Sequence, residues 1–300
     1  MTKTTTNLLG ILITILAGTY FYICMCSECG TSPVEEIAPV VEEVIPEATS
    51  NPFAFNDGDY SYNVNDNFNF DASSSTILTP ISTNIEDGIE SLKSFFTENA
   101  NKVINITGFY KDDETNGSAF PNLGLARANS VKNYLVSKGL SSSQMNIFGE
   151  EMDNMVPKNN TYLGPITYSL DNKSEDAENQ LQALYDKIKA NPLVLYFETG
   201  EASINLTPEQ RQKVADISRY LDKVEGSSAK VVGHTDNTGS RTTNINLGQG
   251  RADFAKAYLS QNGISEAKIV TSSEGPDSPV ASNSTEEGRS KNRRTVVTLN

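Results

Sequence analysis

The first long pattern in the chain is an uncharged, mostly apolar run from Leu8 to Met25. Its eighteen residues lie near the lower limit for a helix that crosses a hydrocarbon core of about 30 Å. Lys3 precedes the run and several glutamates follow it, which favours a cytoplasmic N-terminus with the rest of the chain outside. Residues 1–30 are therefore predicted to form a transmembrane anchor, with a lipoprotein signal and a cleaved signal peptide as alternatives.

All three cysteines, Cys24, Cys26 and Cys29, lie at the end of this run. Their odd number excludes complete pairing within one chain, so interfacial thiols or an intermolecular disulfide are expected. His234 is the one histidine of the chain and lies far from them. We therefore expect neither a zinc site nor any other metal or cofactor.

Residues 31–50 alternate proline, valine, glutamate and alanine. The prolines favour an extended, semi-rigid chain, and the glutamates keep it solvated. At about 3.1 Å per residue, such a segment reaches on the order of 60 Å. It is predicted to be a linker between the membrane end and the folded part.

In the second half, the β-branched run Lys230–Gly233 predicts a buried strand. Apolar residues at helical spacing between Arg251 and Leu259 predict a helix that stops at Gly263. Asp236 then lies on the loop after the strand, and Arg251 is placed in the first turn of the helix, facing back toward the strand end.

A second helical pattern lies between the two halves of the chain. Its apolar positions recur at intervals of three and four residues: Ala177, Leu181, Leu184, Tyr185 and Ile188. Asn191-Pro192 is predicted to end this helix. We expect it to pack on the second half, with a rigid connector as the alternative.

Asp236 and Arg251 combine one carboxylate with one guanidinium, fifteen positions apart. Such a pair can hold a zwitterion, the aspartate taking an ammonium and the arginine a carboxylate, because charge-assisted bonds are strong and directional. Peptidoglycan peptides carry such a group at diaminopimelate. The alternative is that the two side chains simply pair with each other, which contributes little at an exposed site.

Three blocks in order identify residues 193–300 as similar to the OmpA-like C-terminal domain. They are Val231-Val232-Gly233-His234-Thr235-Asp236, then Asn244 with Leu247 and Arg251-Ala252, and finally Asn283, Thr285, Gly288-Arg289 and Asn292-Arg293-Arg294. The resemblance implies peptidoglycan binding by these residues: Asp236, Arg251, Thr235, Asn237, Asn244, Leu247 and Arg293. Taken alone, the basic cluster of Arg289, Lys291, Arg293 and Arg294 is more typical of a solvated face. Gly248 and Gly250 depart from the family pattern and are expected to loosen the first turn of the helix.

The chain also contains an internal repeat. Asp112–Gly139 aligns without a gap onto Asp236–Gly263, 124 residues later. The identical positions are Asp112, Asn122, Leu123, Gly124, Arg127, Ala128, Lys132, Tyr134, Leu135 and Gly139. Upstream, Leu78-Thr79-Pro80 resembles Leu206-Thr207-Pro208, which is expected to enter a helix. Residues 51–172 are therefore predicted to be a first, degenerate OmpA-like domain, and residues 173–300 a second one.

The first copy is altered around its charged pair. His234-Thr235 become Tyr110-Lys111, acidic residues follow Asp112, and Lys158-Asn159-Asn160-Thr161 replaces the Asn-Arg-Arg block. Asp112 and Arg127 form a candidate second site, but extra carboxylates are expected to compete for Arg127 and Lys111 to pair with Asp112. The alternative role of this copy is a spacer or a protein-contact domain.

The net charge of −14 lies in the first half: residues 1–190 hold twenty-five acidic and eleven basic side chains, and residues 191–300 hold thirteen of each. Nucleic-acid binding needs a basic footprint and is not expected. No catalytic constellation stands out, so no enzyme is predicted. A flagellar stator role is disfavoured, because Leu8–Met25 holds no acidic residue to carry protons.

We predict an α/β fold, an α+β sandwich with two tandem β-α-β-α-β domains and mixed sheets, behind one transmembrane helix and an extended linker. The expected function is non-covalent binding of peptidoglycan by a membrane-anchored protein of the cell envelope, with its domains in the periplasm. Membrane, peptidoglycan and other envelope proteins are the expected partners, and inner or outer membrane is left open. The alternative is an envelope scaffold whose OmpA-like domains are mainly structural.

Overall fold

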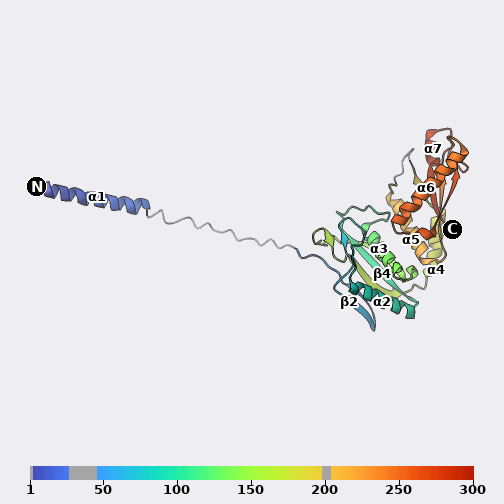
Figure 1. The fold of residues 1–300 in the computed structure, drawn as a ribbon, viewed down its shortest axis with the longest axis horizontal. Helices are drawn as coiled ribbons and strands as arrows, with labels where there is room; N and C mark the ends of the chain where they lie inside the picture. Colours follow the sequence, from blue (N-terminus) through green and yellow to red (C-terminus); the bar gives the residue numbers. More distant parts are fainter. Residues whose placement is uncertain (1–2, 27–45, 198–203) are drawn as a thin grey trace. The chain divides into compact units, whose positions relative to one another are not determined.

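The computed structural model describes residues 3–26, 46–197 and 204–300 (Figure 1). It contains two compact units, Met1–Pro46 and Glu47–Asn300. Residues 31–45 of the predicted linker and Cys29 lie outside the described residues, so those predictions stay as they are. We refer to residues 51–172 and 173–300, the two predicted OmpA-like domains, as the first and second domain.

The N-terminal apolar run forms one helix, α1 (Lys3–Cys26). Its apolar side chains are exposed, for example Ile11 and Leu16, and so is the free Cys24. The helix is thus confirmed, whereas the predicted membrane span is not: within the described ranges, no helix combines the length and the apolarity needed to cross a bilayer. Hydroxyl-bearing residues such as Thr14 and Thr19 interrupt the run and lower its hydropathy.

The first domain is built on a three-stranded sheet of order β5-β4-β7, in which β4 runs parallel to β5 and antiparallel to β7. Its strands are β4 (Lys102–Tyr110), β5 (Met145–Glu151) and β7 (Ile166–Asn172). Two short antiparallel pairs accompany it, β1 (Phe53–Asp57) with β2 (Tyr60–Val64) and β3 (Phe70–Asp71) with β6 (Thr161–Tyr162). The helices are α2 (Thr83–Glu98), α3 (Leu123–Ser137) and the 3₁₀ turn η1 (Ser142–Gln144).

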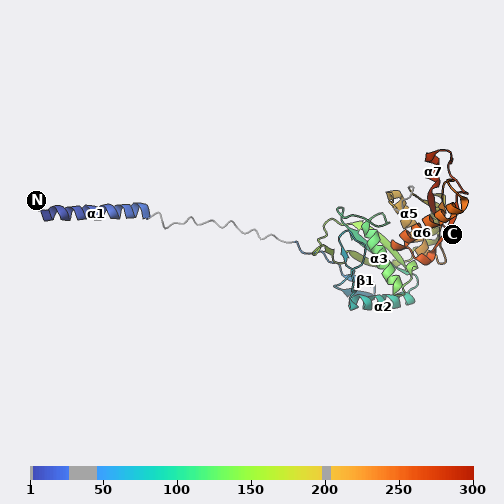
Figure 2. The same cartoon turned by 45° about the horizontal axis from the view of Figure 1, so that its top comes forward.

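The second domain has a four-stranded mixed sheet of order β10-β9-β11-β8. The two central strands run antiparallel to each other, and β9 is parallel to β10. The strands are β8 (Leu193–Tyr196), β9 (Ala229–His234), β10 (Ile269–Gly275) and β11 (Arg294–Leu299). The helical elements are α4 (Ala177–Ala190), α5 (Pro208–Lys223), α6 (Arg241–Gln261), η2 (Glu266–Lys268) and α7 (Glu286–Asn292). The predicted α/β class with mixed sheets is confirmed (Figure 2).

Local sequence signals explain where most of these elements begin and end. Thr207 caps α5 and forms a reciprocal capping box with Gln210. Gly263, with a φ of +88°, follows the end of α6 as expected. In the first domain, by contrast, Thr79-Pro80 does not open a helix, because α2 begins at Thr83 with Ser82 as its cap.

Helix α6 is longer than predicted and begins at Arg241, ten residues before Arg251. Ser240 supplies the cap by accepting a hydrogen bond from the backbone N–H of Thr243 at 3.1 Å. Arg251 therefore lies in the middle of the helix, and its predicted place in the first turn is wrong. Gly248 and Gly250 are likewise interior positions that do not loosen a first turn.

Gly248 serves the contact between α6 and the sheet. A Cβ added at Gly233 would overlap the carbonyl oxygen of Gly248, and one added at Gly248 would overlap Ser273. The helix backbone therefore lies directly on β9 and β10. In the first domain, Gly108 on β4 and Gly124 on α3 make the same close approach. In both domains this contact brings the arginine of the helix to the end of the central strand.

Each domain has its own apolar core, and α4 belongs to the second one. Ile188 of α4 is buried in that core, and Lys187 pairs with Asp216 of α5 at 2.7 Å. The prediction that this helix packs on the second half is confirmed, as is its end at Ala190.

Hydrogen bonds also join the two domains to each other. The Asn262 side chain accepts from the backbone N–H of Ala119 at 2.7 Å, and the Asn133 amide donates to the Gly263 carbonyl at 2.9 Å. Both contacts involve the residues just after α6. They place the C-terminal end of α6 against the α3 region of the first domain.

Candidate functional site

Arg251 of α6 is held at the end of β9 by a single hydrogen bond. Its Nη1 donates to the backbone carbonyl of His234 at 3.0 Å, and its guanidinium carbon lies 5.8 Å from the centre of the Phe197 ring. Within the described residues no acidic side chain forms an ion pair with it. Burial lowers the pKa of Arg251, the nearby Arg293 lowers it further, and Asp236 acts in the opposite direction. Arg251 is therefore a half-buried cation with unused donors.

Asp236, on the loop after β9, has other partners than Arg251. Its Oδ2 accepts from Nη1 of Arg293 at 3.1 Å, and its Oδ1 accepts from the backbone N–H of Thr238 at 2.9 Å. Burial favours the neutral acid, but these two hydrogen bonds outweigh it, so the pKa of Asp236 lies below its usual value. The alternative in which Asp236 pairs directly with Arg251 is thus not observed.

Arg293, directly after α7, links this carboxylate to a second one. Its Nη2 donates to Oε1 of Glu286 at 3.0 Å, while its buried Nε has no partner within the described residues. Glu286 was not among the predicted site residues. Its position in the first turn of α7, seven residues before Arg293, is the signal that would have indicated it.

The other predicted site residues divide into supporting and exposed positions. Thr235 is buried, and its hydroxyl donates to the Asp236 carbonyl at 2.8 Å. Asn244 is also buried and donates to the Thr238 carbonyl at 3.1 Å, which holds the loop onto α6. Asn237 is exposed, and Leu247 is 47% exposed one helical turn before Arg251. Asn237 and Leu247 are thus the two that a ligand can reach directly.

Asn292 is a supporting residue that the motif contained but the site prediction omitted. It is fully buried, and its side-chain oxygen accepts from the backbone N–H groups of Val280 and Ala281 at 2.8 and 3.1 Å. Its amide donates to the Ala281 carbonyl and to the Asn283 side chain. These four bonds fix the loop before α7 and, through α7, the position of Arg293.

The C-terminal basic cluster does not act as one surface. Arg289 and Lys291 form exposed pairs with the glutamates one turn earlier, Glu286 and Glu287. Arg294 is buried and donates to the Ser278 carbonyl at 3.0 Å. Arg293 alone reaches the predicted site.

In the first domain, the corresponding arginine is fully occupied. Glu114 accepts from both terminal nitrogens of Arg127, at 2.6 and 3.0 Å, and three backbone carbonyls accept the remaining donors: those of Phe109, Asp71 and Ser74. Arg127 is completely buried and Glu114 nearly so. All five donors of the guanidinium are used, so no donor is left for a carboxylate ligand.

Asp112 lies apart from this pair. It is exposed, and its backbone N–H donates to Asp153 at 3.3 Å. The expected competition by an extra carboxylate is confirmed for Glu114. The expected Lys111–Asp112 pair is wrong, because Lys111 pairs with Asp113 at 3.4 Å. The structure therefore does not bring Asp112 and Arg127 together as a second site.

The two copies also differ by one residue at the strand end. Arg127 donates to the carbonyl of Phe109 as Arg251 donates to that of His234, and each acceptor directly follows the glycine that contacts the helix. Three residues separate Gly108 from Asp112, but two separate Gly233 from Asp236. The gapless alignment of the repeat therefore ends at the loop, and Phe109 takes the place of His234.

Comparison with known proteins agrees with this repeated architecture. The model of the OmpA family matches two segments of the chain, residues 69–162 and 196–293. The chain belongs to the OmpA family. One matched segment lies in each domain and contains the strand and helix that meet at the close glycine contact, β4 with α3 and β9 with α6, so the tandem arrangement is also supported.

Several sequence relatives share about 100 residues with this OmpA-family chain. A probable lipoprotein, YiaD, of Escherichia coli is 36% identical over 98 residues, which are 33% of this chain and 45% of that protein. The peptidoglycan-associated lipoprotein of Buchnera aphidicola is 32% identical over 121 residues, 40% of this chain and 68% of that protein. The peptidoglycan-binding protein ArfA of Mycobacterium bovis is 32% identical over 120 residues, 40% of this chain and 36% of that protein.

Among solved structures, the peptidoglycan-associated lipoprotein of Burkholderia pseudomallei is 26% identical, with a TM-score of 0.32, and the match covers 36% of this chain and 89% of that one. The cell wall anchor of the T6SS from Pseudomonas aeruginosa is 27% identical, with a TM-score of 0.29, over 40% and 93% of the two chains.

Proposed function

We propose that the second domain binds peptidoglycan non-covalently, by its diaminopimelate-containing peptide, within the cell envelope. Arg251 takes a carboxylate of the diaminopimelate residue, and Asp236 takes the ammonium group beside it. Leu247 and Asn237 contact the rest of the peptide. The site binds without chemistry.

One observation carries this proposal: the two equivalent arginines of the chain, Arg127 and Arg251, have different hydrogen-bond partners. Arg127 is held by Glu114 with bidentate geometry, whereas Arg251 uses one donor, on a backbone carbonyl, and has no ion-pair partner within the described residues. A half-buried guanidinium is stabilised by an anion that offers two oxygens. The internal carboxylate of the first domain thus illustrates the geometry that a ligand carboxylate can adopt on Arg251.

Asp236 is suited to the ammonium group for a related reason. Its lowered pKa keeps it ionised at neutral pH. Arg293 and Thr238 each occupy one lone pair, and a carboxylate offers about four acceptor positions. The names of two relatives, a peptidoglycan-associated lipoprotein and a peptidoglycan-binding protein, support peptidoglycan as the ligand.

Membrane association through α1 is the second part of the proposal. The large apolar side chains between Ile11 and Met25 are 55–70% exposed. Such a helix is stabilised by a lipid surface. With the second domain on the wall, the chain would tether the wall to a membrane. Flotation of the full chain with phospholipid vesicles tests this part, and a chain that stays at the bottom of the gradient contradicts it.

The wall-binding proposal is tested by co-sedimentation of the full chain with purified diaminopimelate-type peptidoglycan. Arg251→Gln and Asp236→Asn are expected to weaken binding by at least about tenfold, because each removes a charge-assisted contact. Arg241→Gln is the matched control, since Arg241 lies on the same helix but pairs with Asp277 at the surface. Thermal unfolding shows whether each variant is folded.

Soluble peptides sharpen the assignment of Arg251. A muropeptide with lysine in place of diaminopimelate lacks the carboxylate assigned to this residue. We expect it to bind wild type about as weakly as the diaminopimelate peptide binds Arg251→Gln. If folded Arg251→Gln sediments with the wall like wild type, Arg251 is structural and the scaffold alternative is favoured.

A further inference from the structure

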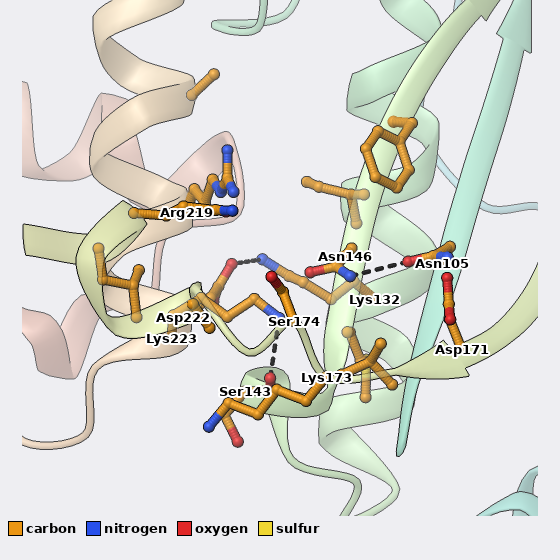
Figure 3. A pocket seen from close by; sticks show the side chains of 18 of the residues that line it. Asn105, Lys132, Ser143, Asn146, Asp171, Lys173, Ser174, Arg219, Asp222 and Lys223 are labelled. Atoms are coloured by element: carbon orange, nitrogen blue, oxygen red, sulfur yellow. Dashed lines mark hydrogen bonds and ion pairs between the residues drawn. The ribbon is translucent and has the colours of Figure 1, made fainter. Parts of the chain in front are cut away.

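A cavity of about 490 Å³ lies between the first domain and helices α4 and α5 of the second (Figure 3). Strands β4 and β5 with η1 form one side, and the turn after β7 leads across its base. It is separate from Arg251 and Asp236, which do not line it. Its size falls in the range of sites for small molecules, which often occur between domains.

Three basic side chains reach this cavity without an acidic ion-pair partner within the described residues. The side chains of Lys173 and Arg219 are exposed and form no hydrogen bond with any described residue, and Nζ of Lys223 donates to the Ser143 carbonyl at 2.9 Å. Burial lowers the pKa of Lys223 to about 8; the neighbouring Asp222 acts in the opposite direction, and the charges of Arg219, Lys173 and Lys132 lower the pKa further. The three cations therefore repel one another, although the chain as a whole carries a net charge of −14.

The acidic residues of the cavity are mostly engaged elsewhere. Asp222 pairs with the buried Lys132 of α3, and Asp216 pairs with Lys187 on the outer side of α4. Asp171 accepts from the backbone N–H of its neighbour Asn172 at 2.7 Å. Lys173, Arg219 and Lys223 are thus left to interact with a mobile anion.

The wall formed by the first-domain sheet is partly apolar. Val103 and Phe148 line it together with Asn105 and Asn146, whose side chains hydrogen-bond to each other at 2.8 Å, and Leu181 of α4 adds an apolar side chain from the second domain. Phe148 is 46% exposed, so a large part of its ring is in contact with water. An apolar body placed here would remove that surface from water, which is favourable.

We propose that this interdomain cavity binds a small amphipathic anion, with its carboxylate or phosphate on Lys173, Arg219 and Lys223 and its apolar part against Phe148 and Leu181. Bound in this way, the ligand bridges both domains and stabilises their contact. The arginine fork accepts either a carboxylate or a phosphate, so the shared feature of the ligand is an anionic head on an apolar body.

Calorimetric titration of the full chain with hexanoate and with hexyl phosphate tests the proposal and distinguishes the two head groups. Two control probes are titrated in the same way: inorganic phosphate represents the anionic head group alone, and hexanol represents the apolar body alone. We expect at least one of the two amphipathic anions to bind more tightly than both partial probes. If neither anion binds, or if hexanol binds as tightly, the proposal is wrong.

Variants locate the binding on this cavity. Arg219→Gln and Lys173→Gln are each expected to weaken binding about tenfold, because a hydrogen bond to a charged group is lost. Phe148→Ser should weaken the amphipathic anion without weakening inorganic phosphate. Lys230→Gln, an exposed lysine of β9 outside the cavity, is the matched control. Binding that is unchanged in folded Arg219→Gln and Lys173→Gln would overturn the assignment.

Discussion

Glu114 binds Arg127 with both carboxylate oxygens inside the first domain, whereas Arg251 of the second domain has no carboxylate partner among the described residues. The aligned partner of Glu114 in the second copy is Thr238, which contributes a backbone N–H to Asp236 instead. Glu114 thus occupies two donors of Arg127, whereas Thr238 forms no hydrogen bond to Arg251.

Removing this internal carboxylate should destabilise the first domain. Glu114→Ala leaves the fully buried Arg127 without its ion pair, which typically costs about 3–5 kcal/mol of unfolding free energy. Chemical denaturation measures the loss, and Glu150→Ala, an exposed glutamate of β5, is the control. Added acetate should recover part of the stability of Glu114→Ala by binding Arg127. A loss below about 1 kcal/mol would contradict the importance of the pair.

Two glycine substitutions should have opposite effects on the second domain. Gly233→Ala inserts a Cβ into the backbone of α6 and is expected to cost about 1–3 kcal/mol or more. Gly250 lies inside α6, and a Cβ added there has no neighbouring atom within 4 Å. Gly250→Ala should therefore raise the unfolding free energy by about 0.5–1 kcal/mol, because alanine favours the helix. Thermal unfolding compares them directly. If the two substitutions change stability equally, the close contact between β9 and α6 does not exclude a side chain at position 233.

Asn292→Ala should destabilise the loop before α7 and displace Arg293. Four hydrogen bonds of a fully buried side chain are lost, so we expect a cost of about 2–4 kcal/mol. Asn246→Ala, an exposed asparagine on α6, should change stability by less than about 0.5 kcal/mol. Wall binding should fall in Asn292→Ala even well below its unfolding temperature. If folded Asn292→Ala binds the wall as tightly as wild type below its unfolding temperature, α7 does not position the site.

Lys223 should make stability depend on pH in the alkaline range. Its pKa falls from 10.5 to about 8 on folding, so below pH 8 the folded state bears the full cost of a buried charge. Between about pH 8 and 10.5 the unfolded state binds more protons, and raising the pH therefore favours folding. The difference in unfolding free energy between wild type and Lys223→Met should move in favour of wild type across this window. A difference that is constant with pH would contradict the lowered pKa.

Sequence patterns anticipated the parts of the fold that depend on local signals. The strand at Lys230–Gly233, the stop at Gly263, the start of a helix at Thr207-Pro208 and the end of α4 before Pro192 all follow from propensity and capping. The beginning of α6 was missed because residues 241–250 are polar and glycine-rich. Their helix is stabilised by the Ser240 cap and by packing on β9, which apolar periodicity does not report.

The sequence named Asp236, Arg251 and Arg293 as candidate site residues, and their role in binding stays a prediction. Spacing along the chain suggested a direct Asp236–Arg251 pair as the alternative, whereas α7 brings Arg293 to Asp236 from 57 residues away. Lys111 gives a second example, because it was expected to pair with Asp112 but pairs with Asp113. Which charges meet depends on where loops end in space, and the distance along the sequence does not contain that information.

The sequence by itself determined the repeat, the mixed α/β class, the residues that carry charge at the site and the position of the apolar N-terminal helix, because each of these depends on residue type and local order. Tertiary structure alone decided that Arg127 is closed by Glu114 while Arg251 stays open, and that Lys173, Arg219 and Lys223 gather around one cavity. Electrostatic and hydrogen-bonding partners are chosen by proximity after the two domains pack, and the free energy of a charge depends on those partners more than on its own identity.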